Sequence, residues 1–524
     1  MKKVYTYGLF LLMVCLIISG CSKNKSNQDY VSEGPSENFN KEGFPIVDEE
    51  ITLNFFARKS PPNGPYKDML VFQEYEKMTN MKIVWDDVPQ DGFTERKNLQ
   101  FSSKKLPDAF YKASITQLEA IKYGTSGILI PLEKLIEDYA PNLTKLFNQY
   151  PEIKASITAP DGHIYAIPAI LTLNSARTDK IWINHTWLDK LGLQEPKNQD
   201  ELEKVLRAFK EDDPNGNGEN DEIPLTFRNW NQLMNSMSGS WGLINQMGYH
   251  LNVENDKVKI WMTDDRLKDY LQFLNKLYKE ELLDRGVFTQ EESIFVGNMS
   301  SGNLGMFWNQ APDAFDKVKE HYSGISPIVG PYGDQLYPSS PIARDFGTFA
   351  ITSSNKYPYE TMRWIDHFYS EEGSIFLRYG IEGKTFYYKE DGTPESNDEI
   401  LNDERGIGVA VGQFSPYPGG GAPQLVTERN ASAINPPLAQ EAQEKLDPYL
   451  AKPIYGTPLF DEKTTKEVDR LRQDIDLYYE ESTSKFITGD LSFEKWDEYV
   501  ATLEGMGIKR LEEIYQEAYD LNYK

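Results

Sequence analysis

Short apolar runs rich in β-branched and aromatic residues alternate with helical patterns along this chain, and this alternation constrains the fold more than any other feature. Residues 51–57 read ITLNFFA, residues 66–80 read as a helix, and residues 82–88 and 108–113 read as further strands. Strand, helix and strand in succession form the unit of a parallel sheet. More strand candidates follow at 164–170, 180–185, 304–308 and 347–354. The sequence therefore predicts an α/β fold.

The helical segments each carry one apolar face. In residues 199–211 the apolar side chains recur at helical spacing, and Asn198 with Glu201 is placed like a capping box at the start of the segment. Residues 266–283 repeat this pattern, and the last sixty or so residues read as helices only. We expect the end of the chain to form a helical region.

Composition narrows the class of protein. The 524 residues include 81 acidic and 55 basic side chains, a net charge of −26, which argues against nucleic-acid binding because such proteins need a basic face. The length predicts about two to four domains with a large core. The 2 cysteines, Cys15 and Cys21, leave no disulfide framework and no cysteine-rich zinc site.

The N-terminus has the pattern of a secretory signal. Lys2 and Lys3 precede an apolar stretch from Leu9 to Ile18, which is too short to span a bilayer as a helix. Residues 18–21, Ile-Ser-Gly-Cys, resemble a bacterial lipobox, in which the cysteine carries the lipid after cleavage. We therefore expect a signal peptide at 1–20, lipid on Cys21, a flexible tether over 21–48 and attachment to the outer face of the cell membrane. The alternative is a plain secretory signal.

A loop over residues 213–224 carries the clearest chemical motif. Oxygen-bearing side chains recur at alternate positions, and Gly218 stands where an EF-hand loop turns sharply. Pro224 occupies the position of the usual bidentate glutamate, so Glu222 would take that role. The alternative is a surface turn rich in Asn, Gly and Asp. The pattern predicts a structural calcium ion bound by Asp213, Asn215, Asn217, the Glu219 carbonyl, Asp221 and Glu222.

Catalytic signatures are sparse. The five histidines form no HExxH motif, no G-x-S-x-G elbow occurs, and the removal of Cys15 and lipidation of Cys21 would leave no free thiol. A glycosidase pair of carboxylates stays open as an alternative because acidic residues are abundant.

Tryptophans beside amides and glycines are more informative. Trp230, Trp241 and Trp308 occur in FRNWNQL, SGSWGLI and GMFWNQAPD. Aromatic rings cover the apolar faces of sugars while amides bind hydroxyl groups, so this pattern favours carbohydrate binding. The alternative for each tryptophan is a place in the core.

Taken in order, these segments resemble the extracellular solute-binding proteins of ABC importers, family 1, in particular the long lipoproteins of Bacillus-like and Paenibacillus-like bacteria. The resemblance spans nearly the whole chain and is most specific over residues 183–226, where an amphipathic helix opens into the Asn/Asp loop. Alginate-binding relatives hold calcium in that loop, which supports the calcium interpretation. Further matching segments are the lipobox, FQEYEKMTNMKIVW, LPDAFY, DGHIYAIPA, YLQFLNKLYKEELLD, GNLGMF and GIEGKTF.

The resemblance implies a two-lobed fold of the periplasmic-binding-protein type II kind, with a hinge and a helical C-terminal region. We place the first lobe at 49–172 and 346–425, and the second at 173–345 and 426–524. Ligand residues in such proteins come from strand ends at the cleft, which nominates Arg58, Tyr111, Lys112, Trp241, Trp308, Asn309 and Arg344.

The resemblance implies a monomeric binding protein rather than an enzyme, which captures an oligosaccharide between its lobes and delivers it to an ABC permease in the membrane. Two alternatives remain: a secreted glycosidase or lyase, and a peptide-binding or signalling lipoprotein.

Overall fold

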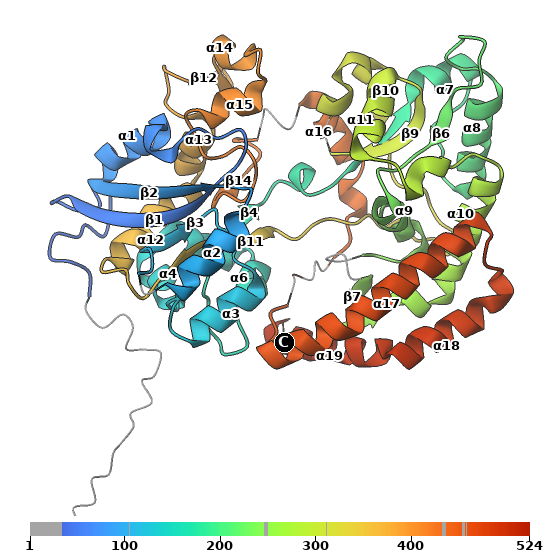
Figure 1. Cartoon of the computed structure of the whole chain (residues 1–524). Coiled ribbons are helices and arrows are strands. Elements are labelled where there is room, and N and C mark those ends of the chain that lie inside the picture. The colour runs from blue at the N-terminus through green and yellow to red at the C-terminus, as the bar shows by residue number, and fades with distance from the viewer. Residues whose placement is uncertain are drawn as a thin grey trace, which may run out of the picture.

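The chain forms two α/β bodies joined by a few extended segments (Figure 1). The computed structural model describes residues 34–103, 105–245, 250–310, 312–431, 436–452, 456 and 458–523. The predicted signal peptide, Cys15, Cys21 and the first part of the tether lie outside the described residues.

The first body is built on a six-stranded sheet with the order β14-β4-β11-β3-β1-β2. Strand β1 runs parallel to β2 and β3, whereas β11 is antiparallel to both of its neighbours, β3 and β4. The early strands confirm the parallel unit predicted from the sequence. The strands are β1 Ile51–Lys59, β2 Met81–Pro89, β3 Ala109–Tyr111, β4 Ile167–Leu171, β11 Ala343–Ile351 and β14 Leu425–Val426.

Helices cover both faces of this sheet, and their apolar sides form two buried clusters with it. They are α1 Leu70–Thr79, α2 Phe93–Ser102, α3 Gln117–Thr125, α4 Glu133–Tyr139, α5 Pro141–Gln149, α6 Pro151–Ile157, α12 Pro358–Asp366 and α13 Glu371–Tyr379. A smaller projection carries the hairpin β12 Phe386–Tyr388 and β13 Pro394–Ser396 with α14 Asp398–Leu401 and α15 Ile407–Gly412.

The second body is built on a four-stranded sheet with the order β10-β5-β9-β6. Its strands are β5 Lys180–Asn184, β6 Ile223–Leu225, β9 Leu304–Asn309 and β10 Tyr322–Gly324. A separate hairpin joins β7 Leu251–Glu254 to β8 Lys257–Ile260. The helices are α7 His185–Leu191, α8 Gln199–Glu211, α9 Trp230–Ser236, α10 Asp265–Lys279, α11 Glu292–Ser301, α16 Pro437–Glu444, α17 Glu462–Thr488, α18 Trp496–Met506 and α19 Ile508–Tyr523.

The C-terminal helices belong to the core of the second body. Residues of α17, α18 and α19 share one buried cluster with α8, α9 and α10, and α17 lies along α10 (Figure 1). The predicted helical C-terminal region is confirmed.

Helix α8 forms as its sequence predicts. Leu202, Val205, Leu206 and Phe209 are all buried. The predicted capping box is half formed, because the Asn198 side chain accepts from the Glu201 N–H at 3.0 Å while Glu201 itself accepts from the Lys197 N–H at 2.8 Å.

Between the described helices and strands, the chain passes from one body to the other at three places: between β4 and β5, between β10 and β11, and between β14 and α16. The predicted divisions at 172/173 and 425/426 fall beside the first and third crossings, whereas β11 already begins at Ala343. Leu459 packs into a cluster of the first body, although its neighbours along the chain belong to the second. The exact lobe boundaries stay predictions.

Candidate functional site

A polar pocket of about 690 Å³ lies where the crossing segments meet the second body. This volume is within the usual range of small-ligand sites. Three stretches far apart in the sequence line it. They are Ala176–Asp179, Arg228–Ser236 and Tyr337–Asp345, and Asn245 and Gln310 complete the lining. Within these stretches, the side chains that do not line the pocket are Trp230, Leu233, Met234 and Ile342. We call this cavity the hinge pocket.

Helix α9 supplies the amide-rich wall of the hinge pocket. The Asn229 side chain caps the helix by accepting from the Gln232 N–H at 3.0 Å. Asn231 and Asn235 lie one helical turn apart, so their side chains share a face. The helix therefore directs several amides into one cavity.

Gln232 is held in place by two neighbours. Its side-chain oxygen accepts from the Arg228 N–H at 2.7 Å, and its NH₂ group donates to the Asp179 carboxylate at 2.8 Å. The Arg228 guanidinium donates to the Asn309 side-chain oxygen at 2.9 Å. Because these groups are already bonded to one another, the wall is ordered before a ligand arrives.

Two hydrogen bonds hold the first crossing segment at the hinge pocket. Arg177 donates to the Ser340 carbonyl at 2.7 Å, and Gln310 donates to the Ala176 carbonyl at 2.8 Å. Burial lowers the pKa of Arg177. Arg344 is exposed and reaches the Ala176 carbonyl at 3.5 Å.

The first body reaches the hinge pocket through Asp345. The Gly421 N–H donates to the Asp345 carboxylate at 3.4 Å, and Arg58 donates to the Gly420 carbonyl at 3.1 Å. Gly421 has a φ of 73°, and a Cβ there would lie 2.3 Å from the Arg58 side chain. The positive φ favours glycine here, and a larger residue would also displace the end of the Arg58 side chain.

Lys112 lies behind the loop of residues 416–421, which we call the glycine loop. Its amine donates to the carbonyls of Pro416 and Pro418 at 2.7 Å each and to the Asn63 side-chain oxygen at 2.9 Å. Burial, with a smaller contribution from the nearby Arg58 charge, lowers the pKa of Lys112 to about 6. The residue holds the loop from within the protein.

The structure places the nominated ligand residues in different environments. Arg344 lines the hinge pocket, Asn309 lies buried behind Arg228, and Arg58 lies on the adjoining part of the first body. The other nominated residues, Tyr111, Lys112, Trp241 and Trp308, are at most 1% exposed.

The two tryptophans pack inside the second body. Trp308 stacks on Phe227 with ring centroids 4.5 Å apart, and Trp241 packs on Tyr270 at 4.7 Å. Neither ring has a free face in this structure, because β9 is buried along its whole length and Trp241 belongs to the core.

The amides of α9 and the carboxylate of Asp179 were not among the nominated residues. The segment FRNWNQLMN did contain a signal, since Asn229, Asn231, Gln232 and Asn235 gather around a helix start. The tryptophan in that segment, Trp230, is 7% exposed and faces the core instead.

The predicted calcium loop is an exposed turn organised around Asp213. One Asp213 carboxylate oxygen accepts from the N–H groups of Gly216 and Asn217 at 2.8 and 3.2 Å, and the other accepts from Gly218 at 3.0 Å. Asp221 accepts from the amides of Asn215 and Asn217 at 2.9 Å each, and these bonds lower the pKa of Asp221.

One carboxylate oxygen of the predicted calcium loop is available to a cation. The Oε2 atom of Glu222 is buried and has no hydrogen-bond partner among the described residues. Over the same residues, no group of three or more His, Cys, Asp or Glu side chains is arranged for a metal. A cation here would depend on amide and carbonyl oxygens as well as carboxylates, which is the donor set that calcium accepts.

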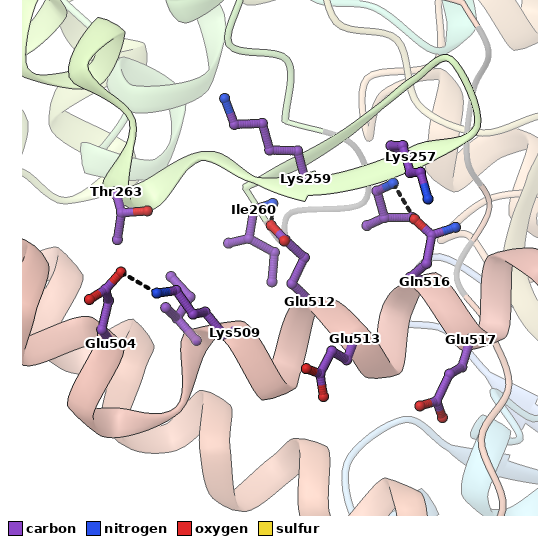
Figure 2. Close-up of a pocket in the computed structure, with 12 residues that line it drawn as sticks. Lys257, Lys259, Ile260, Thr263, Glu504, Lys509, Glu512, Glu513, Gln516 and Glu517 are labelled. Carbon is purple, nitrogen blue, oxygen red and sulfur yellow. Dashed lines mark hydrogen bonds and ion pairs between the residues drawn. The ribbon is translucent and has the colours of Figure 1, made fainter.

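A further groove between β8 and α19 has a structural explanation. Figure 2 shows Glu512 and Gln516 of α19 pointing toward β8, where they accept from the N–H groups of Ile260 and Val258 at 2.8 Å each. The helix thereby satisfies the open edge of the hairpin.

The first and second bodies are the two lobes of the fold. Two lobes joined by three crossings, with a polar pocket at the junction, define a solute-binding protein. The description "bacterial extracellular solute-binding protein" matches residues 59–375, and the chain belongs to this family. Its members bind solutes, so the prediction of a binding protein rather than an enzyme is confirmed. Among the described residues, none of the helices combines the length and apolarity that a bilayer crossing requires.

Relatives support the same assignment along the whole chain. The fructooligosaccharide ABC transporter substrate-binding protein FusA of Streptococcus pneumoniae is 31% identical over 99% of this chain and 98% of its own length. The polygalacturonan/rhamnogalacturonan-binding protein YtcQ of Bacillus subtilis is 25% identical over 98% of both chains. The solved structure of FusA with kestose has a TM-score of 0.68, 27% identity, and coverage of 90% of this chain and 99% of that one.

Proposed function

We propose that this protein captures an uncharged oligosaccharide in the hinge pocket and delivers it to an ABC permease. The observation that carries the proposal is the amide-rich wall of α9, in which Asn231 and Asn235 share a face beside Gln232. Amides donate and accept hydrogen bonds at once, so they suit the hydroxyl groups of a sugar. Closure of the lobes would complete the binding site.

Charge balance favours an uncharged sugar over a polyuronate. The hinge pocket is lined by Asp179 and Asp345 as well as by Arg228 and Arg344, and the remaining arginine, Arg177, is buried in bonds to the chain itself. The relative FusA is named for fructooligosaccharides. Fructooligosaccharides are therefore the first ligands to test.

The test is isothermal titration calorimetry of residues 22–524 with kestose, raffinose and a galacturonan oligomer. We expect kestose to bind and Asn231→Ala to weaken it about tenfold, since losing one good hydrogen bond costs roughly 1.4 kcal/mol. The matched control is Gln194→Ala, an exposed amide outside the hinge pocket. Equal weakening by both variants, or tight binding of the galacturonan alone, would contradict the proposal.

Attachment to the outer face of the membrane through lipid on Cys21 is part of this proposal. It is supported by the lipobox-like sequence, by the extracellular family and by the relative named lipoprotein LipO of Bacillus subtilis, which is 24% identical over 76% of this chain. The test is membrane fractionation in a Gram-positive host: the wild-type protein should stay with the membrane, and Cys21→Ala should appear in the medium.

We also propose that the loop over 213–222 binds calcium. Support comes from the oxygen-bearing side chains around Asp213 and Asp221, from the unpartnered Oε2 of Glu222, and from the related solved structure described as a FusA EF-hand mutant. The ion would stabilise the loop next to α8 and take no part in capturing the sugar.

A further inference from the structure

Two of the amides that line the hinge pocket, those of Asn235 and Asn245, are bonded to each other. A side-chain amide has an oxygen, which accepts a hydrogen bond, and an NH₂ group, which donates. The end that bonds to the protein therefore determines which end is left for a ligand. Asn235 belongs to α9, which lies on the side of the second body that faces the crossing segments (Figure 1).

Asn245 is oriented by a backbone group. The N–H of His250 donates to the Asn245 side-chain oxygen at 2.7 Å, and this bond is buried. A backbone N–H can only donate, so the atom of Asn245 that faces it must be the oxygen. The Asn245 NH₂ group is therefore on the other side, where it donates to the Asn235 side-chain oxygen at 2.5 Å.

His250, which supplies this N–H, is held on several sides. Its carbonyl accepts from the Trp261 N–H at 3.0 Å, and its φ is 56°. Its ring is 4% exposed and packs against Tyr479 and Trp261, with centroids 4.6 and 5.1 Å away. The backbone N–H therefore keeps its direction. The Asn245 amide cannot reverse without leaving a buried donor unpaired, which costs free energy.

Asn235 is the last member of this chain of hydrogen bonds. Its oxygen is used by Asn245, so the group left for the hinge pocket is its NH₂, a donor. A second amide of the lining is fixed in the same sense. The Asn229 oxygen accepts from the Gln232 N–H at 3.0 Å, which leaves the Asn229 NH₂ group. Both amides therefore offer donors to a ligand.

We infer that backbone N–H groups fix the amides of Asn235 and Asn229, so that this wall of the hinge pocket selects ligand atoms that accept hydrogen bonds. Asn245 is a positioning residue, because it acts through Asn235. A sugar hydroxyl satisfies the wall by accepting, and its own proton is then available to the carboxylates of Asp179 and Asp345. The inference rests on the proposed function, because it describes how the same pocket binds a sugar.

Neutron diffraction from ligand-free, deuterium-exchanged crystals of residues 22–524 tests the orientation directly. It locates the deuterons of each amide, whereas X-ray data at ordinary resolution do not separate amide nitrogen from oxygen. The deuterons of Asn235 should point into the hinge pocket. Deuterons that point toward Asn245 would overturn the inference, whatever sugar the protein binds.

Calorimetry with kestose and with derivatives that carry fluorine in place of one hydroxyl tests the selection. Fluorine accepts a hydrogen bond weakly and cannot donate one, so we expect at least one derivative to bind the wild type within about threefold of kestose. In Asn245→Asp the carboxylate still accepts from the His250 N–H but cannot donate, so Asn235 turns its oxygen to the pocket. The affinity for that derivative relative to kestose should then fall about tenfold, and Asn235→Asp should cause the same fall.

Asn198→Asp is the matched control. Asn198 caps α8 through the same kind of bond, accepting from the Glu201 N–H at 3.0 Å, and lies outside the lining of the hinge pocket. This variant should bind every sugar as the wild type does.

The remaining outcomes separate the inference from the proposed function. An unchanged relative affinity in Asn235→Asp, or a fall that Asn245→Asp does not share, would overturn the inference while the hinge-pocket proposal stands. A wild-type protein that binds kestose and none of the derivatives would overturn it too. Failure of kestose to bind the wild type would contradict the proposed function, and the neutron map would still decide the orientation of Asn235.

Discussion

Two loops, one in each lobe, are held by side chains in opposite ways. In the first lobe the amine of Lys112 donates to the carbonyls of Pro416 and Pro418 in the glycine loop. In the second lobe the carboxylate of Asp213 accepts from three backbone N–H groups of its own loop, those of residues 216 to 218. One loop is held by a donor from outside, and the other by an acceptor from within.

The difference bears on the proposal that the second loop binds calcium. Lys112 uses its donors on three oxygens, so the glycine loop is complete with protein groups alone. Around Asp213 and Asp221 carboxylate and amide oxygens accumulate, and Glu222 keeps a buried oxygen without a partner among the described residues. Carboxylate and amide oxygens are the donors that calcium accepts, so the unpartnered Glu222 oxygen fits the proposed ion.

Removing the donor from the first loop should have the largest effect. Lys112→Met leaves three buried acceptors without their partner, so we expect the free energy of unfolding to fall by about 3 kcal/mol. Urea denaturation measures this change. The matched control, Lys82→Met at an exposed position of β2, should stay within about 0.5 kcal/mol of wild type. A change in Lys112→Met no larger than that of the control would contradict a structural role for Lys112.

Calcium should stabilise the second loop by a slightly smaller amount. At a calcium concentration about 100 times the dissociation constant, binding to the folded state adds about 2.7 kcal/mol. Differential scanning calorimetry with calcium and with EDTA should show this difference for the wild type and its loss in Asp213→Asn.

Asp212→Asn, next to the loop, is the control and should keep the response to calcium. If magnesium stabilises the protein as strongly as calcium, the loop does not select calcium. If Asp213→Asn still responds to calcium, the ion binds elsewhere and the contrast between the two loops disappears.

The smallest expected effect is the pH dependence of the Lys112 contribution. Because burial lowers the folded-state pKa of Lys112 to about 6, the unfolded chain binds more protons above that pH, and stability rises with pH. The difference in unfolding free energy between wild type and Lys112→Met should therefore grow by about 1 kcal/mol from pH 6.5 to 7.5.

Lys180 provides the comparison for this prediction. Its amine donates to the Ser175 and Thr178 carbonyls, and burial lowers its pKa only to about 8. The difference between wild type and Lys180→Met should stay flat up to about pH 8 and rise above it. A flat curve for both lysines would show that the amines keep their charge in the folded protein.

Local patterns in the sequence predicted the elements well where one face of an element is buried. Helix α8 forms at 199–211 with its four apolar residues inside, because helical spacing records which side faces the core. Strand β9 shows the limit of this reasoning. All of its residues are buried, so no alternation remains to show which side of the strand Trp308 faces.

The residues that line the hinge pocket were harder to predict for a related reason. A large aromatic ring beside amides suits a sugar, but it suits the core equally, and Trp230, Trp241 and Trp308 are all at most 7% exposed. The amides around Trp230 line the hinge pocket instead. Polar side chains were the better guide, because burying them unpaired costs free energy and they therefore stay near water.

The sequence by itself determined the α/β class, the amphipathic helices and the loop around Asp213, because each depends on residues close together along the chain. The tertiary structure decided where the hinge pocket lies. Residues 176–179, 228–236 and 337–345 meet because the chain crosses between two lobes, and the C-terminal helices contact the first lobe through α3, α6 and the buried Leu459. Contacts between residues so distant in sequence depend on the packing of the whole fold, which no local pattern records.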